Sequence, residues 1–121
     1  ELIKYHSDLD LALMRISRRL EPLPVYKGAK KLVRGQAVVA IGSPLGLFNS
    51  VSNGIISGFR IVDGVDMIQF TSPFSRGSSG GAVLNMAWEV IGISTAGFDG
   101  GQNINLAVGY ESIGMFISGF Q

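Results

Sequence analysis

The sequence predicts an all-β fold, a barrel or sandwich of short antiparallel strands followed by a short C-terminal helix. Glycine makes up 17 of the 121 residues, about twice its usual frequency, which suits many tight turns. Apolar and β-branched runs of strand length alternate with clusters of turn residues along the chain, as they do in all-β domains. A chain of this length suits one compact domain.

The expected strands are separated by turn signals. The longest covers residues 51–62, and Gly54 and Gly58 within it predict bends or bulges, as at a barrel corner. The pair Asp63-Gly64 predicts a hairpin into the next strand. In order, the expected strands cover residues 8–16, 36–41, 51–62, 67–71, 82–85, 88–95 and 102–108. Helical spacing then predicts a short closing helix through Tyr110, Ile113, Phe116 and Ile117.

Residues 17–35 interrupt the strand pattern. This stretch is rich in Arg, Lys, Pro and Gly, which is the composition of a connector between two packing units. We therefore expect three parts: an opening strand within residues 1–16, a linker at 17–35, and a main domain at 36–121.

Composition excludes several classes of function. The formal net charge is +1, so there is no electrostatic case for binding nucleic acid. Cysteine is absent, which excludes a disulfide framework and cysteine–zinc sites. No apolar run approaches the roughly 20 residues needed to cross a bilayer. We expect no nucleic acid partner, no membrane span, and no metal or cofactor.

The stretch Gly77-Ser78-Ser79-Gly80-Gly81 suits nucleophilic chemistry. A serine between glycines can lie on a tight, open loop, where its hydroxyl and nearby backbone N–H groups face one small volume. Acyl transfer needs that arrangement, with a nucleophile and with donors directed at the developing oxyanion. The alternative interpretation is a flexible turn, because Gly and Ser are common turn residues.

Asp10 places a carboxylate within an otherwise apolar stretch. In the alternating segment 8–16, Leu9, Leu11 and Leu13 share one strand face and Asp10 lies on the other. A charge inside such a segment is costly unless a partner group pairs with it. Either Asp10 has such a partner, or it is an edge-strand charge exposed to water.

Together these segments resemble the trypsin-like serine proteases, most closely the HtrA/DegP branch. The resemblance covers nearly the whole chain in order, and the ordered set is more specific than any single motif. The matching motifs are Asp10-Leu11-Ala12-Leu13, residues 40–46, 51–58 and 76–82, Asn85, residues 89–93, and Thr95-Ala96.

The resemblance implies a fold and a set of roles. The main domain would be the second lobe of a chymotrypsin-like two-barrel protease, an antiparallel six-stranded β-barrel, and residues 1–16 would hold the last strand of the first barrel. Ser79 matches the nucleophile, and Asp10 matches the carboxylate of the catalytic triad. The N–H groups of Gly77 and Ser79 match the oxyanion hole. The strand that pairs with an extended polypeptide substrate is matched by Ser94, Thr95 and Ala96.

The triad histidine has no counterpart in this chain. His6 is the only histidine, and four residues along one strand would separate it from Asp10 by about 13 Å. In the family the histidine lies in the first barrel, so we expect His6 to be a surface or turn residue. The chain is then a fragment whose partner is a missing N-terminal barrel, and we expect it to be inactive alone.

The resemblance also indicates a cleavage preference. Pro73 matches the floor of the primary specificity pocket, and residues 71–76 contain no acidic residue that would select Lys or Arg. Phe74, Ala96 and Ala107 suggest an apolar pocket. We expect small or medium aliphatic side chains just before the cleaved bond.

Three positions depart from the family pattern. Ser78 replaces a common Asn, and Thr71-Ser72 replaces an Asp-Ala pair that is frequent in the HtrA branch. Trp88 stands where a hairpin glycine is usual. Because tryptophan resists positive φ, we expect this hairpin to differ, with Trp88 packed in part against the barrel.

Two other functions stay open. One is a non-catalytic barrel that captures extended peptides along residues 94–96. The other is a self-associating barrel whose uncovered face forms a homo-oligomer or a strand-swapped dimer. Asp10 favours the enzyme, because a pure binding module has no need of a carboxylate in an apolar strand. From the resemblance alone we expect an extracytoplasmic location, periplasmic or in the cell envelope.

Overall fold

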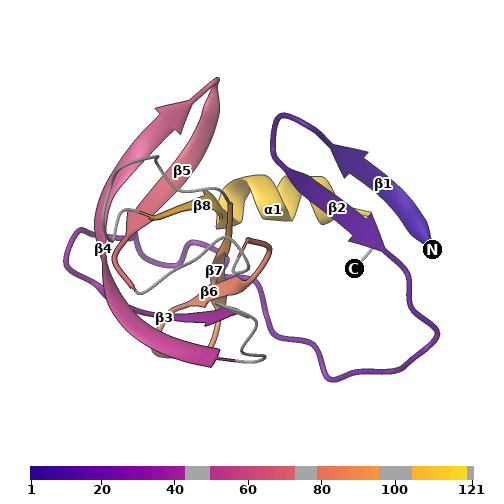
Figure 1. Cartoon of the computed structure of the whole chain (residues 1–121), viewed down its shortest axis with the longest axis horizontal. Helices are drawn as coiled ribbons and strands as arrows, with labels where there is room; N and C mark the ends of the chain where they lie inside the picture. The colour runs from indigo at the N-terminus through magenta and orange to yellow at the C-terminus, as the bar shows by residue number, and fades with distance from the viewer. Residues whose placement is uncertain (43–49, 73–78, 96–104, 120–121) are drawn as a thin grey trace.

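The computed structural model describes residues 1–42, 50–72, 79–95 and 105–119. Six of the described strands close into an antiparallel barrel in the order β3-β4-β5-β8-β7-β6, with β6 pairing back onto β3 (Figure 1). This confirms the prediction of an antiparallel six-stranded barrel followed by a short helix. The barrel strands are β3 (Ala37–Gly42), β4 (Ser50–Val62), β5 (Val65–Phe70), β6 (Ala82–Leu84), β7 (Val90–Ser94) and β8 (Asn105–Gly109).

Side chains from all six strands fill the barrel interior. The side chains of Ile56, Phe70 and Ile91 have no exposed surface. Each buried side chain of this size contributes about 1.5–3 kcal/mol on leaving water, so the alternating apolar positions of the strands drive closure. The other members of this interior cluster are Leu32, Val38, Ala40, Ile68, Val83 and Ala107.

The β4–β5 hairpin follows its sequence signals. Asp63 and Gly64 form its turn with φ of 51° and 79°, the left-handed pair that an Asp-Gly turn adopts. The pairing register shifts between Ile56 and Gly58, where a bulge was expected. At Gly54 a Cβ would lie 1.4 Å from the carbonyl oxygen of Thr71, so glycine is required for the two backbones to approach.

Helix α1 (Tyr110–Ile117) follows β8 directly and covers the predicted residues. Ile113 and Phe116 are its buried residues, and they lie on one face because they are three positions apart. Ile113 joins an apolar cluster outside the barrel with Val39, Leu84 and Val90. The helix therefore covers the outer side of the barrel near the start of β7.

Residues 1–16 form a hairpin in place of a single strand. β1 (Leu2–His6) pairs antiparallel with β2 (Leu11–Met14), and residues 7–10 make the turn. The strand predicted over residues 8–16 is therefore shorter than expected, because the chain reverses just before Leu11. Leu9 and Leu11 then pack on the barrel with a cluster that contains Met67, Leu106 and Val108.

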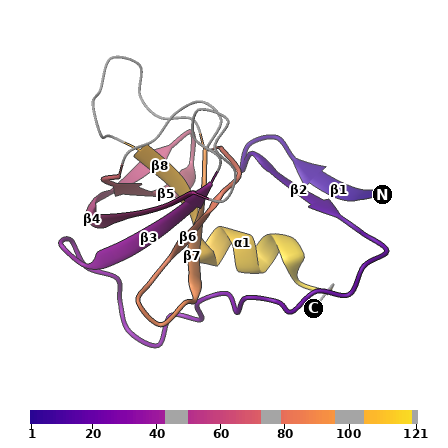
Figure 2. The same cartoon turned by 60° about the horizontal axis from the view of Figure 1, so that its bottom comes forward.

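Helix α1 joins this hairpin to the barrel. The Phe116 ring centroid lies 4.7 Å from Nζ of Lys4, which is a cation–π distance. The ring of His6 meets the same ring edge-on, with 6.5 Å between centroids. In Figures 1 and 2, α1 runs from the barrel wall toward the hairpin.

The stretch 17–35 lies outside the strands and runs across the barrel. The N–H of Tyr26 donates to the carbonyl of Val90 at 2.8 Å. The Tyr26 ring packs edge-on against that of Tyr110, with 4.9 Å between centroids, and Leu32 is buried in the barrel interior. The second half of this stretch is thus part of the packing of the barrel.

The β6–β7 turn corrects the prediction for Trp88. Trp88 has a φ of 64°, so it adopts the left-handed conformation of a turn glycine, and the expected change of hairpin is wrong. The side-chain oxygen of Asn85 fixes this conformation by accepting from the N–H groups of Ala87 and Glu89, at 3.0 Å each. The Trp88 side chain is 56% exposed, so slightly less than half of its surface is covered.

Candidate active site

Asp10 lies at the end of the turn between β1 and β2. Its φ is 57°, a left-handed conformation that Asp tolerates better than most residues, and its N–H donates to the carbonyl of Ser7 at 3.2 Å. Leu9 and Leu11 on either side pack on the barrel. A turn seated on the barrel therefore presents the carboxylate, and the predicted strand position of Asp10 is wrong.

The carboxylate of Asp10 accepts a hydrogen bond from the barrel. The hydroxyl of Thr95 donates to Oδ2 of Asp10 at 2.6 Å, the short distance typical of a charged acceptor. Thr95 is 8% exposed, and its N–H donates to the carbonyl of Leu106 at 2.9 Å. The hydroxyl is thus held by the β7–β8 pairing, and it orients the carboxylate.

Ser79 lies beside the same strand end. It is exposed, and the next residue, Gly80, has a φ of 91°, which favours glycine. The N–H of Gly80 donates to the carbonyl of Ser94 at 2.8 Å, and the N–H of Ser94 donates to the carbonyl of Gly81 at 2.9 Å. The hydroxyl of Ser94 donates to that carbonyl as well, at 3.1 Å. The end of β7 therefore anchors the backbone directly after Ser79.

Two consecutive residues thus link the predicted nucleophile and the predicted carboxylate. Ser94 binds the backbone next to Ser79, and Thr95 binds the carboxylate of Asp10. The structure therefore brings Asp10 and Ser79, which are far apart in the sequence, to one end of β7.

The remaining predicted site residues are placed as follows. Ala107 pairs with Ser94 and is fully buried in the barrel interior, so a role in a specificity pocket stays a prediction. The predictions for four residues lie outside the described part of the chain: Pro73, Phe74, Gly77 and Ala96.

His6 is exposed at the end of β1, as expected for a surface or turn residue. The separation between His6 and Asp10 that a single strand predicts is wrong. The two residues flank one tight turn, with His6 opposite Leu11 in the hairpin. Nδ1 of His6 accepts a hydrogen bond from the N–H of Leu9 at 3.2 Å. His6 therefore stabilises the turn that carries Asp10.

Two supporting side chains escaped sequence reasoning. Thr95 was expected to bind substrate, and its bond to Asp10 has no local sequence signal. Asn105 is 5% exposed, and its amide donates to the carbonyl of Ser72 at 2.9 Å. This bond holds the chain as it leaves β5 toward the serine loop. The sequence signal that could have indicated this role is the amide side chain of Asn105 at the start of an otherwise apolar strand.

Metal binding and membrane insertion are two further possibilities for the described residues. No group of three or more His, Cys, Asp or Glu side chains among them is arranged to hold a metal ion. In the same part of the chain, no helix has both the length and the apolar character that crossing a membrane requires.

Comparisons with known proteins agree with this architecture. The model of the trypsin-like peptidase domain matches residues 1–93. The chain belongs to the trypsin-like peptidase family. A probable periplasmic serine endoprotease of DegP-like type from Chlamydia trachomatis is 35% identical over 113 residues, which cover 89% of this chain and 22% of that protein. An HtrA-type protease solved with a decapeptide superimposes with a TM-score of 0.83 at 28% identity, over 98% of this chain and 40% of that chain. These matches place this family member in the HtrA-type branch.

One relative carries a name of another kind. The anti-sigma-I factor RsgI9 of Acetivibrio thermocellus is 33% identical over 108 residues, which cover 88% of this chain and 15% of that protein. This peptidase-family chain thus spans about a quarter or less of the length of these curated relatives.

Proposed function

We propose that this chain is the second barrel of an HtrA-type serine endopeptidase, and that it hydrolyses peptide bonds when a first barrel supplies the histidine. The observation that carries the proposal is the Thr95–Asp10 hydrogen bond, next to the anchoring of the Ser79 backbone by Ser94. A triad needs a carboxylate and a hydroxyl on either side of one imidazole. Attachment of both groups to one strand end supports that role.

In the proposed mechanism, Oγ of Ser79 attacks the carbonyl carbon of the peptide while the histidine takes its proton. The amine leaves with that proton, and water then hydrolyses the acyl-enzyme. Asp10 accepts the other N–H of the imidazole and so selects its tautomer. The N–H groups of Gly77 and Ser79 donate to the developing oxyanion.

The substrate in this proposal is an extended polypeptide that pairs with the end of β7. Ser94, Thr95 and Ala96 form the pairing segment in this proposal, and Ser94 also holds Gly80 and Gly81 through both of its backbone groups. Small or medium aliphatic side chains would enter a pocket formed by Pro73, Phe74, Ala96 and Ala107. The decapeptide in the HtrA-type structure supports a peptide ligand.

The isolated chain is expected to be inactive in this proposal. His6 is the only histidine, and its Nδ1 is bonded within the turn that carries Asp10. Without a base, Ser79 keeps an ordinary hydroxyl. We infer that a missing N-terminal barrel is the partner that completes the site.

A fluorophosphonate probe tests the proposal, applied to the chain alone and to a longer polypeptide with the sequence encoded before Glu1. We expect Ser79 to be labelled in the longer polypeptide and not in the chain alone. Ser79→Ala should abolish labelling, whereas Ser78→Ala, one position away in the same loop, should keep it. A folded longer polypeptide that is not labelled would contradict the protease.

The second candidate function is a non-catalytic barrel that binds peptides or itself. A relative named as an anti-sigma factor and the single histidine favour it. Exposed apolar side chains on the N-terminal hairpin favour self-association, either as a homo-oligomer or by strand swapping; these are Leu2, Tyr5, Met14 and Ile16. Sedimentation of the chain across a concentration series distinguishes the self-associating form, because a monomer throughout the series excludes it.

The location we propose is extracytoplasmic, in the periplasm or cell envelope. The support is the name of the Chlamydia relative, which describes that protein as periplasmic. Fractionation of the source cells with an antibody against residues 36–121 tests it, and recovery with cytoplasmic markers would contradict it.

A further inference from the structure

His6 is a titratable side chain that the proposed mechanism does not use. Its Nδ1 accepts a hydrogen bond from the N–H of Leu9 at 3.2 Å, so the neutral ring carries its proton on Nε2. A protonated imidazole has an N–H at both ring nitrogens and accepts no hydrogen bond. The bond to Leu9 therefore exists only while the ring of His6 is neutral.

This bond helps to shape the turn that presents Asp10. The N–H of Asp10 donates to the carbonyl of Ser7 at 3.2 Å, and Asp10 has a φ of 57°, a conformation that the surrounding contacts must maintain. The carboxylate of Asp10 in turn accepts the hydroxyl of Thr95 at 2.6 Å. Loss of the Leu9 bond removes one of the contacts that hold the turn, so it loosens the position of this carboxylate.

Protonation of His6 would also change its contact with helix α1. The ring of His6 meets the ring of Phe116 edge-on, with 6.5 Å between centroids. Nζ of Lys4 lies 4.7 Å from the centroid of the same Phe116 ring. A charged His6 would be a second cation beside this ring, and two like charges repel each other. Protonation therefore weakens the contact of the hairpin with the helix as well as the turn.

The carboxylates of the turn offer a protonated His6 no ion pair in this arrangement. Asp8 and Asp10 both belong to the turn. Within the part of the chain that the structure describes, no carboxylate oxygen lies within 4.0 Å of a His6 nitrogen. Leu11, which pairs with His6 across the hairpin, is apolar. Protonation thus removes a hydrogen bond without forming an ion pair in its place.

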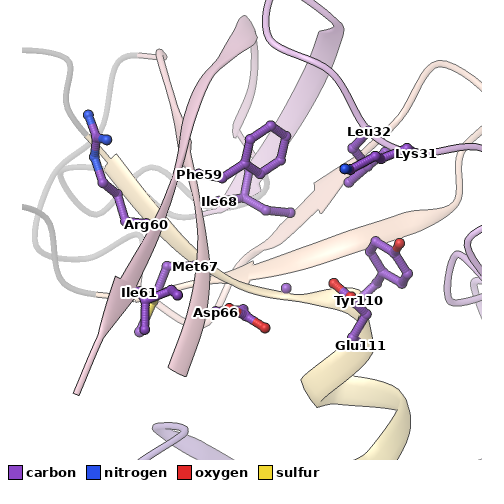
Figure 3. A pocket seen from close by; sticks show the side chains of 11 residues that line it. Lys31, Leu32, Phe59, Arg60, Ile61, Asp66, Met67, Ile68, Tyr110 and Glu111 are labelled. Carbon is purple, nitrogen blue, oxygen red and sulfur yellow. The ribbon is translucent and has the colours of Figure 1, made fainter. Parts of the chain in front are cut away.

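The titratable groups of α1 lie at the other end of the helix from His6. Tyr110 and Glu111 begin the helix, whereas Phe116 lies roughly 8 Å further along its axis. Tyr110 and Glu111 line a cavity of about 390 Å³ at the far end of the barrel, between residues 31–32, the β4–β5 hairpin and the start of α1 (Figure 3). Neither group therefore compensates a charge on His6.

We propose that His6 is a positioning residue for Asp10 that acts only in its neutral form: the neutral ring holds the turn, and protonation releases it. Imidazole side chains change charge between about pH 5 and pH 8. The Leu9 bond is fully present above this range and is lost as the pH falls through it. The consequence for catalysis rests on the proposed function, in which Asp10 orients the triad histidine, and it is a less ordered site at acidic pH.

Two substitutions separate the acceptor from the charge. In His6→Asn, Oδ1 takes the place of Nδ1 and does not titrate; in His6→Gln, Oε1 takes the place of Nε2 and leaves the N–H of Leu9 without its acceptor. The measurement is the protection of the Leu9 amide against exchange with water, relative to the unfolded chain, by NMR on the full chain at about pH 5 and pH 8.

In the natural chain the protection of Leu9 should fall by about fivefold between the higher and the lower pH, because one hydrogen bond is lost. His6→Asn should keep the protection at both pH values, and His6→Gln should lack it at both. The matched control is Asp8→Asn, which removes an exposed carboxylate from the same turn and keeps His6. Its fall in protection should agree with that of the natural chain within about twofold.

The consequence for catalysis is tested in the longer polypeptide that includes the sequence encoded before Glu1. The rate of fluorophosphonate labelling is compared between the natural sequence and His6→Asn at about pH 5.5 and pH 8. The triad histidine titrates in both proteins, so the ratio of their rates isolates the effect of His6. The natural sequence should lose about fivefold more of its labelling rate on acidification than His6→Asn.

Several outcomes would overturn the proposal. One is equal protection of Leu9 at both pH values in a folded natural chain, and another is a His6→Asn variant with the pH dependence of the natural chain. A constant ratio of labelling rates would reject the positioning role, because the turn would not be coupled to Asp10. If the folded longer polypeptide is not labelled at any pH, the proposed function fails, whereas the Leu9 measurement still decides whether His6 controls the turn.

Discussion

Thr95 connects two parts of the chain that no local signal joins. Its backbone belongs to the end of the β7–β8 pairing, and its hydroxyl reaches the turn of the N-terminal hairpin. A hydroxyl in this position satisfies one side of a carboxylate and leaves the others for a further donor. A single side chain can therefore control the orientation of Asp10.

We expect Thr95→Val to reduce the free energy of unfolding by about 1–2 kcal/mol, because the charged hydrogen bond is lost while the side-chain shape is kept. Thr95→Ser keeps the hydroxyl and serves as the control. Combining Thr95→Val with Asp10→Gly, which tolerates positive φ, gives a double-mutant cycle by urea unfolding with a coupling energy of about 1 kcal/mol. A coupling energy near zero would show that the bond does not hold Asp10.

Trp88 shows that a side chain can occupy a position that favours glycine. Its φ of 64° costs about 1–2 kcal/mol for a residue with a Cβ, and its exposed ring gains little from burial. Trp88→Gly should therefore be about 1 kcal/mol more stable than Trp88→Ala. Thermal unfolding of the two variants makes the comparison, since both lack the ring and differ in the Cβ alone. Equal stability would mean that the Asn85 network imposes no strain.

At the scale of elements, strands and helix could be predicted because their signals are local. Asp63-Gly64 predicted the β4–β5 turn, and helical spacing predicted a helix through four residues that all lie in α1. The hairpin at residues 1–16 could not be read from its alternation, because an alternating apolar pattern continues through the turn. What places Asp10 there is packing of Leu9 and Leu11 on distant strands, which no local pattern reports.

Two glycines in different elements give opposite predictions for the same substitution. Gly54→Ala should destabilise by about 3 kcal/mol or more, because the new methyl group would overlap the backbone of Thr71 at the end of the neighbouring strand β5. Gly114→Ala in α1 should stabilise by about 0.5–1 kcal/mol, because nothing lies within 4 Å and alanine favours the helix. Urea unfolding measures both. A tolerated Gly54→Ala would show that β4 can move away from Thr71.

At the scale of the whole molecule, the family pattern predicted which residues meet, and physical patterns alone did not. For the serine loop the alternative interpretation was a flexible turn, and for Asp10 it was a charge exposed to water. Their approach depends on long-range contacts through Ser94 and Thr95, which sequence spacing does not encode. The cavity at the far end could not be predicted either, because its walls come from three separate stretches of the chain.

Tyr110 lies where the linker, β8 and α1 meet, so its ionisation reports on the assembly of the whole chain. Its ring packs on Tyr26, and a Cβ at Gly28 would lie 3.2 Å from its hydroxyl. Burial, then the charge of Glu111, then Tyr26 raise the pKa of Tyr110 above its ordinary value of 10.0. The phenol therefore keeps its proton longer in the folded chain than in the unfolded chain.

The sign of the pH effect follows from this difference. Below pH 10 both states hold the proton and the contribution of Tyr110 to stability is fully present. As the pH rises through the raised folded pKa, the unfolded state has already lost its proton, so the free energy of unfolding falls. We expect the stability difference between the natural chain and Tyr110→Phe to shrink as the pH rises above 10, measured by urea unfolding at constant ionic strength. Tyr5→Phe, which removes an exposed phenol, is the matched control.

Glu111→Gln should weaken this pH dependence in part, because the charge of Glu111 is the second cause of the raised pKa of Tyr110. A stability difference that grows with pH would contradict the raised pKa.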